Sequence, residues 1–423
     1  MNFFEYVNNE LYCEKVPLKN IADEVGTPVF VYSRQTLERH LRVFSEPFSS
    51  VSHLVCYSMK ACSNLAILKI FSRLGAGVDI VSGGELYRAL SAGVEPSRIV
   101  YSGVGKRASE IDEALLAGIL MFNVESEAEL ELLEIRARSL GIKARIALRV
   151  NPDVDPKTHP YISTGLQKNK FGIDTSRALD LYKQTLKMDW IEPIGIDCHI
   201  GSQLTELGPI LEAVEKLVGI LEQLRSDGID IQYLDIGGGL GIPYDQEEPP
   251  MPSEYGAAVV ERMRDLGVTL ILEPGRVLVG NAGILLTQVL YLKKTKKKLF
   301  VIVDAAMNDL IRPSLYDAHH VVQKVTLRPS QSSPDKLITV DIVGPICESG
   351  DYLAKSRELG EVAFGDHLAV MSAGAYGFSM SSNYNSRPRA PEVLVDGENY
   401  YIIRERETYA DLVRGERIPP HLQ

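Results

Sequence analysis

The sequence has few cysteines and lacks long apolar runs. Its 423 residues contain five cysteines, which are scattered and form no C-x-x-C pair: Cys13, Cys56, Cys62, Cys198 and Cys347. An odd, scattered set excludes a disulfide framework and a zinc ribbon and is typical of a reducing compartment. Residues 1–10 lack the basic start and apolar core of a signal peptide, and no stretch reaches the length of a membrane-spanning helix. We therefore expect a cytoplasmic protein without a membrane partner, and we predict no metal site.

The chain also lacks an excess of basic residues. It carries 45 lysines and arginines against 56 aspartates and glutamates, a net charge of -11. Because an acidic surface does not attract polyanions, a nucleic-acid partner is not expected. The basic run from Lys293 to Lys298 lies between two apolar segments and is interpreted as a solvated hairpin tip.

What the sequence does contain is a regular alternation between about residues 50 and 280. Eight short apolar runs are separated by amphipathic stretches such as "SEAELELLEIRARSL" and "LEAVEKLVGILEQLRS". The runs are HLVCYS, GVDIVS, RIVYSG, LMFNVE, ARIALRV, IGIDCHI, QYLDIGG and TLILEP. Eight β-then-α units favour a (β/α)8 barrel over a doubly wound sheet, and no G-x-G-x-x-G motif opens the first unit.

The pattern changes after residue 280, as two domains would require in a chain of this length. Strand-like segments now follow one another across short polar turns, and "VDGENY" has the D-G pair of a tight hairpin. We predict a barrel over residues 25–280 and a mostly antiparallel β-barrel or sandwich domain over residues 281–423.

Charged and glycine-rich segments follow the predicted strands, at the end of a barrel where active sites form. They are Lys60, Asp79, Glu125, "RVNPD", His199, the turn Gly237–Gly241, and "EPGR" from Glu273 to Arg276. Each has an ordinary alternative. Lys60 alone would be a solvated strand end, His199 a core or surface histidine, and the glycines a flexible loop. Likewise Glu273 or Asp79 would be a helix-cap residue, and Arg276 a rim charge.

Together these residues fit pyridoxal 5'-phosphate. An amine can bind the cofactor's aldehyde covalently, and a carboxylate can keep the ring nitrogen protonated so that the ring accepts electrons. An imidazole can stack on the ring face. Glycine N–H groups after the seventh strand can form an anion nest for the phosphate. We therefore predict a pyridoxal-phosphate site at this rim.

Long segments across the chain carry a resemblance to a known family. They include "YSMKAC", "GVDIVSGGEL", "RVNPDVDPKTHPYISTG", "DIGGGLG", "VDAAMNDLIRPSLYDA", "GPICESGD" and "SAGAYGFSMSSNYNSRPRAPEVLV". The chain resembles the fold-type III pyridoxal-phosphate-dependent decarboxylases, most closely the branch that acts on diaminopimelate. One departure is Cys62, where the family usually has asparagine.

The resemblance implies roles for the matching residues. Lys60 would carry the cofactor, His199 would stack on its ring, and Glu273 would meet the ring nitrogen. The residues implied to contact the cofactor are Lys60, Asp79, His199, Ser202, Gly237, Gly238, Gly239, Glu273, Gly275, Arg276 and Tyr376. The family also implies a homodimer in which the partner's second domain completes each barrel site, bringing Cys347 and Glu348 across the interface. Residues 1–24 would pack on the β domain.

Charge separates the candidate substrates. meso-Diaminopimelate has a distal carboxylate and a distal ammonium, whereas ornithine lacks the distal carboxylate. Glu348 suits the ammonium, and guanidinium and hydroxyl donors suit the carboxylate: Arg276, Arg312, Tyr316 and Tyr376. Alone, Arg312 would be a salt-bridged arginine in a surface turn.

The expected function is therefore decarboxylation of meso-diaminopimelate to L-lysine and carbon dioxide, the last step of lysine biosynthesis. Cys347 would donate the proton to the carbon that loses its carboxylate, although a free cysteine is more often a small buried apolar residue. The alternatives are a decarboxylase of another amino acid such as D-ornithine or D-lysine, a racemase, and a non-catalytic pyridoxal-phosphate carrier. A racemase is expected to place an arginine at the ring nitrogen, and a carrier to lack the second domain.

Overall fold

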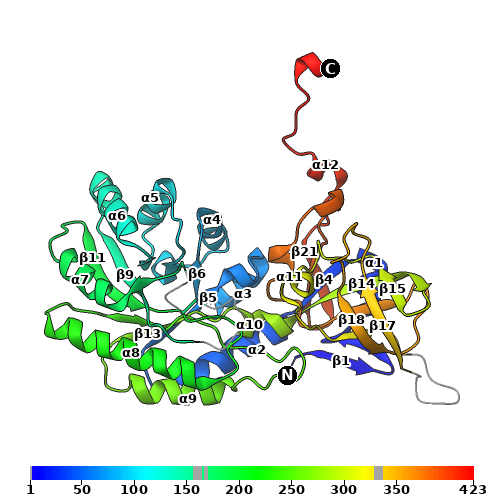
Figure 1. Cartoon of the computed structure of the whole chain (residues 1–423), viewed down its shortest axis with the longest axis horizontal. Helices are drawn as coiled ribbons and strands as arrows, with labels where there is room; N and C mark the ends of the chain where they lie inside the picture. Colours follow the sequence, from blue (N-terminus) through cyan, green and yellow to red (C-terminus); the bar gives the residue numbers. More distant parts are fainter. Residues whose placement is uncertain (1, 156–163, 166–169, 328–336) are drawn as a thin grey trace. The chain divides into compact units, whose positions relative to one another are not determined.

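The chain divides into two compact units. The structure, a computed structural model, describes residues 2–155, 164–165, 170–327 and 337–423 (Figure 1). One unit comprises Leu37–Val279, and the other combines Met1–Thr36 with Gly280–Gln423. Residues 156–163, part of the segment "RVNPDVDPKTHPYISTG" used for the family resemblance, lie outside the described residues. Among the described residues, no helix is both long and apolar enough to cross a membrane.

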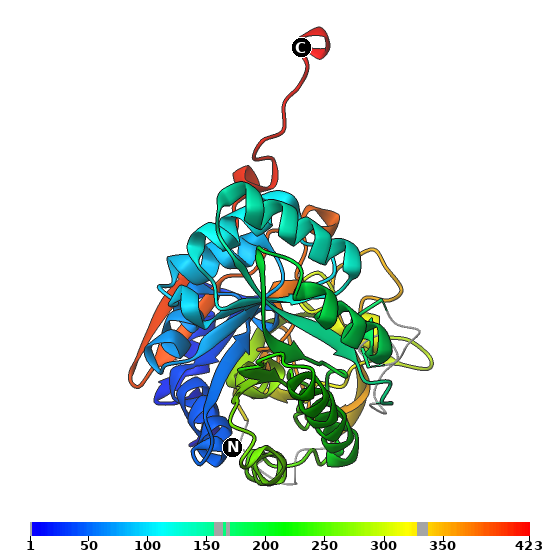
Figure 2. The ribbon, with the colours of Figure 1, turned by 90° about the vertical axis from the view of Figure 1, so that its left-hand side faces the viewer.

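The first unit is a closed barrel of eight parallel strands, as the sequence predicted (Figure 2). The strands are β5 (His53–Ser58), β6 (Gly77–Ile80), β7 (Ile99–Tyr101), β8 (Met121–Val124), β9 (Ala144–Asn151), β11 (Ile191–Asp197), β12 (Tyr233–Asp235) and β13 (Thr269–Leu272). Pairing of β13 with β5 and of β8 with β9 closes the ring. A short strand, β10 (Ile173–Asp174), adds to β9.

Helices follow the barrel strands. They are α3 (Leu65–Arg73), α4 (Gly83–Ser91), α5 (Ala108–Ala117), α6 (Glu127–Leu140), α7 (Thr175–Thr185), α8 (Leu207–Ser226), α9 (Pro252–Met263) and α10 (Arg276–Val279), and α2 (Arg34–Ser45) precedes β5. The two predicted amphipathic helices are α6 and α8. The side chain of Ser126 accepts the Glu129 N–H at the start of α6, and Gly141 ends the helix in the left-handed conformation.

The second unit is built on a mixed, mostly antiparallel sheet. Its strand order is β18 (Ala354–Leu359), β17 (Ile338–Val343), β15 (Leu299–Val303), β14 (Gly283–Lys294), β4 (Val29–Ser33), β20 (Glu392–Asp396) and β21 (Asn399–Arg404), with β16 (Val322–Lys324) and β19 (His367–Val370) paired beside β14. Its other strands and α-helices are β1 (Phe4–Val7), β2 (Glu10–Cys13), β3 (Val16–Pro17), α1 (Leu18–Val25), α11 (Arg312–Tyr316) and α12 (Tyr409–Leu412).

The chain's start belongs to this second unit. Phe4, Leu11 and Ile21 share one buried cluster with Ile284 and Val393, so the first strands and α1 complete the core of the sheet. The unit also contains residues 25–36, which the sequence assigned to the barrel. The reason is β4, which is fully buried and hydrogen-bonded on both edges, antiparallel to β14 and parallel to β20.

The two predicted hairpins are present in this unit. Strands β14 and β15 pair antiparallel, and Thr295 donates its N–H to the carbonyl of Lys298 at 2.8 Å. The lysines from Lys293 to Lys298 are exposed at this tip, as a solvated turn requires. Strands β20 and β21 are joined by Gly397 and Glu398.

Candidate active site

The interior of the barrel changes from apolar to polar toward the strand ends. Cys56, Val100, Met121, Ala147 and Ile271 share one buried cluster. Because side chains alternate along a strand, the residues two positions later face the same interior. Here the residues two positions later are polar, and the residues paired with them on neighbouring strands are polar as well. They form one polar layer, with one residue from each strand or its end: Ser58, Asp79, Ser102, Asn123, Arg149, Asp197, Asp235 and Glu273.

Lys60 contacts this layer from the single turn that follows β5. Its Nζ lies 2.6 Å from Oδ2 of Asp79, and the side chain of Lys60 is 33% exposed while that of Asp79 is fully buried. Ser58 also donates its hydroxyl to Oδ2 of Asp79, at 2.9 Å. Asp79 does not cap α4, because Ser82 accepts the Glu85 N–H there. Lys60 is therefore an amine held by a buried carboxylate but open on one side.

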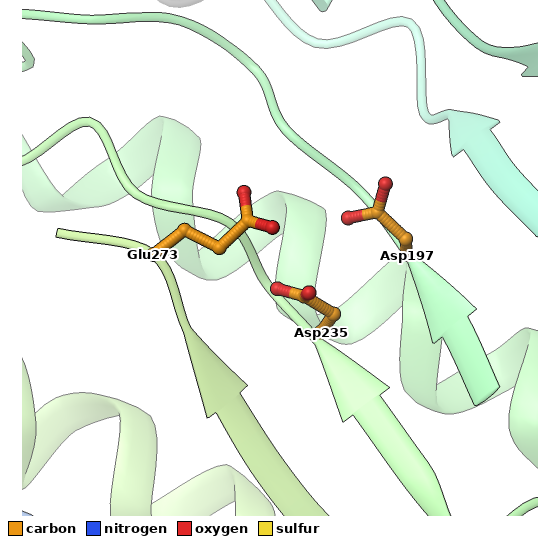
Figure 3. A group of neighbouring side chains, drawn as sticks. All are labelled: Asp197, Asp235 and Glu273. Atoms are coloured by element: carbon orange, nitrogen blue, oxygen red, sulfur yellow. The ribbon is translucent and has the colours of Figure 1, made fainter. Parts of the chain in front are cut away.

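Three buried carboxyl groups lie at the ends of neighbouring strands β11, β12 and β13. Asp197, Asp235 and Glu273, here called the carboxyl cluster, point toward one another in Figure 3, with oxygens within 4.8 Å. Asn123 donates to Oδ2 of Asp235 and to Oε1 of Glu273, each at 3.4 Å. Asp235 also accepts the N–H of Gly237 at 2.9 Å. Glu273 is thus not a helix cap but part of a buried acid group.

Burial shifts the pKa of each acid in the cluster upward. It raises the pKa of Glu273 well above its usual range, and nearby Asp235 and Asp79 raise it further. Burial likewise raises the pKa of Asp197, helped by Asp235. The pKa of Asp235 rises to about 6, because burial outweighs the hydrogen bond from Gly237. Three such groups cannot all be ionised cheaply in one small volume.

Arg149 is the buried cation of the layer. Its Nη1 donates to Oε1 of Glu125 at 2.7 Å, and its Nε lies 4.0 Å from Oδ2 of Asp197. Glu125 also accepts the N–H groups of Gly103 and Gly172, at 3.1 and 2.9 Å. Glu125 therefore connects two rim loops to the barrel, and its carboxylate oxygens accept hydrogen bonds from protein donors.

His199 follows β11 and is partly buried. Its Nδ1 lies 3.1 Å from Oγ1 of Thr164, whose hydroxyl is also 2.8 Å from the His199 carbonyl. Burial, with the positive charges of Arg149 and Lys60, lowers the pKa of His199 well below its usual value. The imidazole is therefore neutral at neutral pH, which suits a flat stacking partner.

The glycine turn after β12 packs tightly on its neighbours. A Cβ on Gly238 would lie 2.0 Å from the carbonyl oxygen of Glu273, and one on Gly239 2.4 Å from that of Gly201. Gly237 and Gly239 have positive φ values of 66° and 108°. Within the described part of the chain, the N–H groups of Gly238, Gly239 and Gly275 donate to no protein acceptor. The close contacts and positive φ values of this turn therefore require glycine, and its amide N–H groups are available to bind an anion.

Arg276 lies at the start of α10 and is buried. It donates from Nη2 to the hydroxyl of Ser202 at 3.0 Å and from Nη1 to the hydroxyl of Tyr244 at 2.8 Å. Arg276 and Ser202, both predicted site residues, are thus brought together, and Tyr244 is added to them.

The remaining predicted residues lie in the second unit. Arg312 is buried rather than in a surface turn, and its Nη1 is 2.7 Å from Nε2 of His320. The other ring nitrogen of His320 lies 2.8 Å from the Met371 carbonyl, so His320 donates there and accepts from Arg312. Tyr316, in α11, is partly buried.

Cys347 is the exposed cysteine among the five, whereas the other four are buried. Its N–H donates to Oδ1 of Asn385 at 2.9 Å. The next residue, Glu348, accepts the hydroxyl of Tyr384 at 3.0 Å. Tyr376 is partly buried with φ of 55°, an unusual backbone conformation for a side chain of this size.

These features of the barrel rim fit pyridoxal phosphate. Lys60 supplies the amine and Glu273 an acid for the ring nitrogen. The glycine turn and Gly275 offer backbone N–H donors to a phosphate, and Oδ1 of buried Asp79 has no hydrogen-bond partner among the described residues. The cofactor's charged groups thus each find a complementary group in this unit.

Sequence reasoning missed part of the site: Asn123, Thr164, Asp197, Asp235 and Tyr244. A signal existed for two of them, because "IGIDCHI" and "QYLDIGG" each place an aspartate at the end of an apolar strand. Thr164 and Asn123 carry no such signal, since their contacts depend on the spatial register of distant segments.

Comparisons with known proteins cover nearly the whole chain. Residues 34–280 match the family described as pyridoxal-dependent decarboxylase, pyridoxal binding domain. A diaminopimelate decarboxylase from Pseudomonas aeruginosa is 53% identical over 420 residues, which are 99% of this chain and 100% of the relative. One from Vibrio cholerae is 51% identical over 422 residues, with the same coverage.

Solved structures agree with these matches. Diaminopimelate decarboxylase from Helicobacter pylori, complexed with L-lysine, has a TM-score of 0.90 and 45% identity over 94% of this chain and 98% of that one. The enzyme from M. jannaschii has a TM-score of 0.94 and 39% identity over 100% of this chain and 99% of that one. A lysine/ornithine decarboxylase from Vibrio vulnificus, at 20% identity and a TM-score of 0.79, shares the fold.

Proposed function

The chain belongs to the family of pyridoxal-dependent decarboxylases, and from this membership we propose that it decarboxylates meso-diaminopimelate to L-lysine and carbon dioxide. The observation that carries the proposal is the 53% identity over 420 residues to a diaminopimelate decarboxylase. Pyridoxal 5'-phosphate is the cofactor, and it supplies the electron sink for the bond that breaks. The reaction is the last step of lysine biosynthesis.

The barrel residues hold the cofactor and set its charge. Lys60 binds it covalently, and Asp79, 2.6 Å from Nζ, orients the amine. Neutral His199 would stack on the ring, and Glu273 would meet the ring nitrogen. The glycine turn would hold the phosphate, with Ser202, Gly275, Arg276 and Tyr376 completing the cofactor contacts.

Residues of the second unit select the substrate and complete the reaction. Arg312, with Arg276 and the hydroxyls of Tyr316 and Tyr376, binds the distal carboxylate, and Glu348 binds the distal ammonium. Arg312 is buried, and the planar fork of a guanidinium matches the two oxygens of a carboxylate. Cys347 donates the proton to the carbon that has lost its carboxylate, and its exposure leaves the thiol accessible to substrate.

The active assembly in this proposal is a homodimer with shared sites. Lys60 comes from one subunit's barrel and Cys347 and Glu348 from the partner's second unit. Lys60 and Cys347 lie in different compact units of the chain, so in this arrangement each site combines the first unit of one subunit with the second unit of its partner.

Carbon dioxide release from three amino acids tests the function. The full-length protein with pyridoxal phosphate is given meso-diaminopimelate, lysine or ornithine at equal concentration. We expect kcat/KM for meso-diaminopimelate to exceed the others by at least about 10²-fold, because substrates without the distal carboxylate forgo its charge-assisted hydrogen bonds to the arginines.

Lysine should form in equal amount to the carbon dioxide, and Lys60→Ala serves as the inactive control. Faster release from ornithine or lysine would assign another decarboxylase activity. Cofactor binding without any release would instead favour a carrier.

A further inference from the structure

The carboxyl cluster contains more acid than its surroundings can neutralise. Asp197, Asp235 and Glu273 are 1%, 0% and 3% exposed. The register explains why they meet: Asp197 pairs with Asp235, and Asp235 pairs with Ile271, two residues before Glu273. Carboxyl oxygens within 4.8 Å of one another in a buried volume repel strongly when all are ionised.

Charged groups from several other elements surround Glu273. Asp235, Asp197 and Asp79 contribute negative charge from β12, β11 and β6. Lys60 contributes positive charge from the turn after β5, and Arg149 from β9. Both cations already have closer partners, because Lys60 lies 2.6 Å from Asp79 and Arg149 lies 2.7 Å from Glu125. Arg149 also lies 4.0 Å from Asp197, but the two cations still face Asp79, Glu125 and the three acids of the carboxyl cluster.

Hydrogen-bond donors distinguish the three acids. Asp235 accepts the Gly237 N–H at 2.9 Å and shares the Asn123 amide, so its ionised form is the best stabilised. Glu273 accepts the other contact from the same Asn123 amide, at 3.4 Å, and its carboxyl group also hydrogen-bonds that of Asp235. Oδ1 of Asp197 has no hydrogen-bond partner in the part of the chain that the structure describes. The negative charge of the carboxyl cluster is therefore best placed on Asp235, the central strand's acid.

We propose that Glu273 carries a proton before the cofactor binds, and that Asp235 is the positioning residue whose charge keeps it there. This inference rests on the proposed cofactor site. The carboxylic acid can donate its proton to a ring nitrogen brought against it: the O–H bond of Glu273 breaks, an N–H bond forms, and Glu273 remains as the carboxylate. No other reactant is needed. The acid cluster thus supplies the proton that the ring requires.

Infrared spectroscopy of the full-length protein tests this. The contribution of a protonated Glu273 is the difference in the carboxylic-acid C=O band between the wild type and Glu273→Gln, freed of cofactor at a pH of about 8.5. We expect this contribution in the wild type, its loss when pyridoxal phosphate is added, and its loss without cofactor in the Asp235→Asn background. Asparagine keeps the size of the side chain and removes its charge, and its remaining oxygen can still accept the Gly237 N–H.

A matched control is Asp309→Asn in the other unit. Asp309 is buried and its pKa is raised to about 7 by burial, so its band should be largely gone at a pH of about 8.5. No Glu273 band in the wild type would overturn the proposal even if Asp235→Asn failed to fold. An equal band in both backgrounds, or one tightly bound divalent cation per chain at the carboxyl cluster, would also overturn it. The band is read without turnover, so a protein that bound the cofactor but did not decarboxylate would leave this result interpretable.

Discussion

At the scale of single residues, some buried charges in the barrel are satisfied by several hydrogen bonds each. Lys106 is the clearest case: its Nζ donates to the carbonyls of Gly103 and Asn123 at 2.9 and 2.8 Å and to Oε1 of Glu129 at 2.7 Å. The side chains of Lys106 and Glu129 are only 1% and 8% exposed. One ammonium thereby joins the loop before α5, the end of β8 and the first turn of α6. Sequence reasoning found no role for it.

Replacing Lys106 with methionine should destabilise the protein strongly. The change leaves Glu129 buried without its cation, which costs roughly 3–5 kcal/mol of the free energy of unfolding. Burial already raises the pKa of Glu129 against the opposing effect of Lys106, and loss of Lys106 raises it further. Because the folded variant then holds a proton that the unfolded chain releases, its stability should fall as pH rises from the unfolded pKa to the folded one. Urea unfolding at several pH values measures this.

The double variant Lys106→Met with Glu129→Gln is the matched control. It removes the buried charge as well, so we expect part of the lost stability to return and the added pH dependence to disappear. A single variant as stable as the wild type across this range would contradict the role given to the pair.

The residues that sequence alone could identify are those with unusual chemistry at a strand end. Lys60, His199, Glu273 and the glycine turn stood out because an amine, an imidazole, an acid and an anion nest are together rare at one rim. Asp235 did not stand out, since an aspartate after an apolar strand is common. Its importance depends on the register that brings it beside Asp197 and Glu273, and that register follows from closure of the whole barrel.

At the scale of elements, local patterns predicted strands well and their partners less well. All eight barrel runs became neighbouring parallel strands because each βα unit adds the next strand beside the last. The strand β4 lacked this constraint. Its apolar run stands before the first barrel strand in sequence, yet it pairs with β14 and β20, more than 240 residues away. No local property of residues 25–36 reveals such distant partners.

At the scale of the whole molecule, one unit is continuous in sequence and the other is made from both chain ends. The family match over residues 34–280 has nearly the bounds of the continuous unit, Leu37–Val279. The proposed catalytic residues are divided between the two units, with Lys60 in one and Cys347 in the other. A shared site in a homodimer is therefore testable with two variants that damage different units.

Mixed dimers should recover activity that neither variant has alone. Lys60→Ala and Cys347→Ala are each expected to be nearly inactive. When subunits exchange at equal amounts, half of the dimers are mixed, and each mixed dimer has one intact site, so about a quarter of wild-type activity should return. Each variant exchanged with itself is the control. Mass spectrometry verifies that subunits have exchanged. The shared site would be rejected if activity did not return after verified exchange, or if sedimentation showed the protein to be a monomer.

The most direct test of the account as a whole is the identity of the lysine that carries the cofactor. The full-length protein loaded with pyridoxal phosphate is reduced with borohydride, digested, and mapped by mass spectrometry. We predict a single cofactor-mass adduct per chain, on the peptide that contains Lys60. An adduct on another lysine, such as Lys106 or a residue of the exposed run Lys293 to Lys298, or the absence of any adduct, would contradict the assignment of Lys60 and the site built around it.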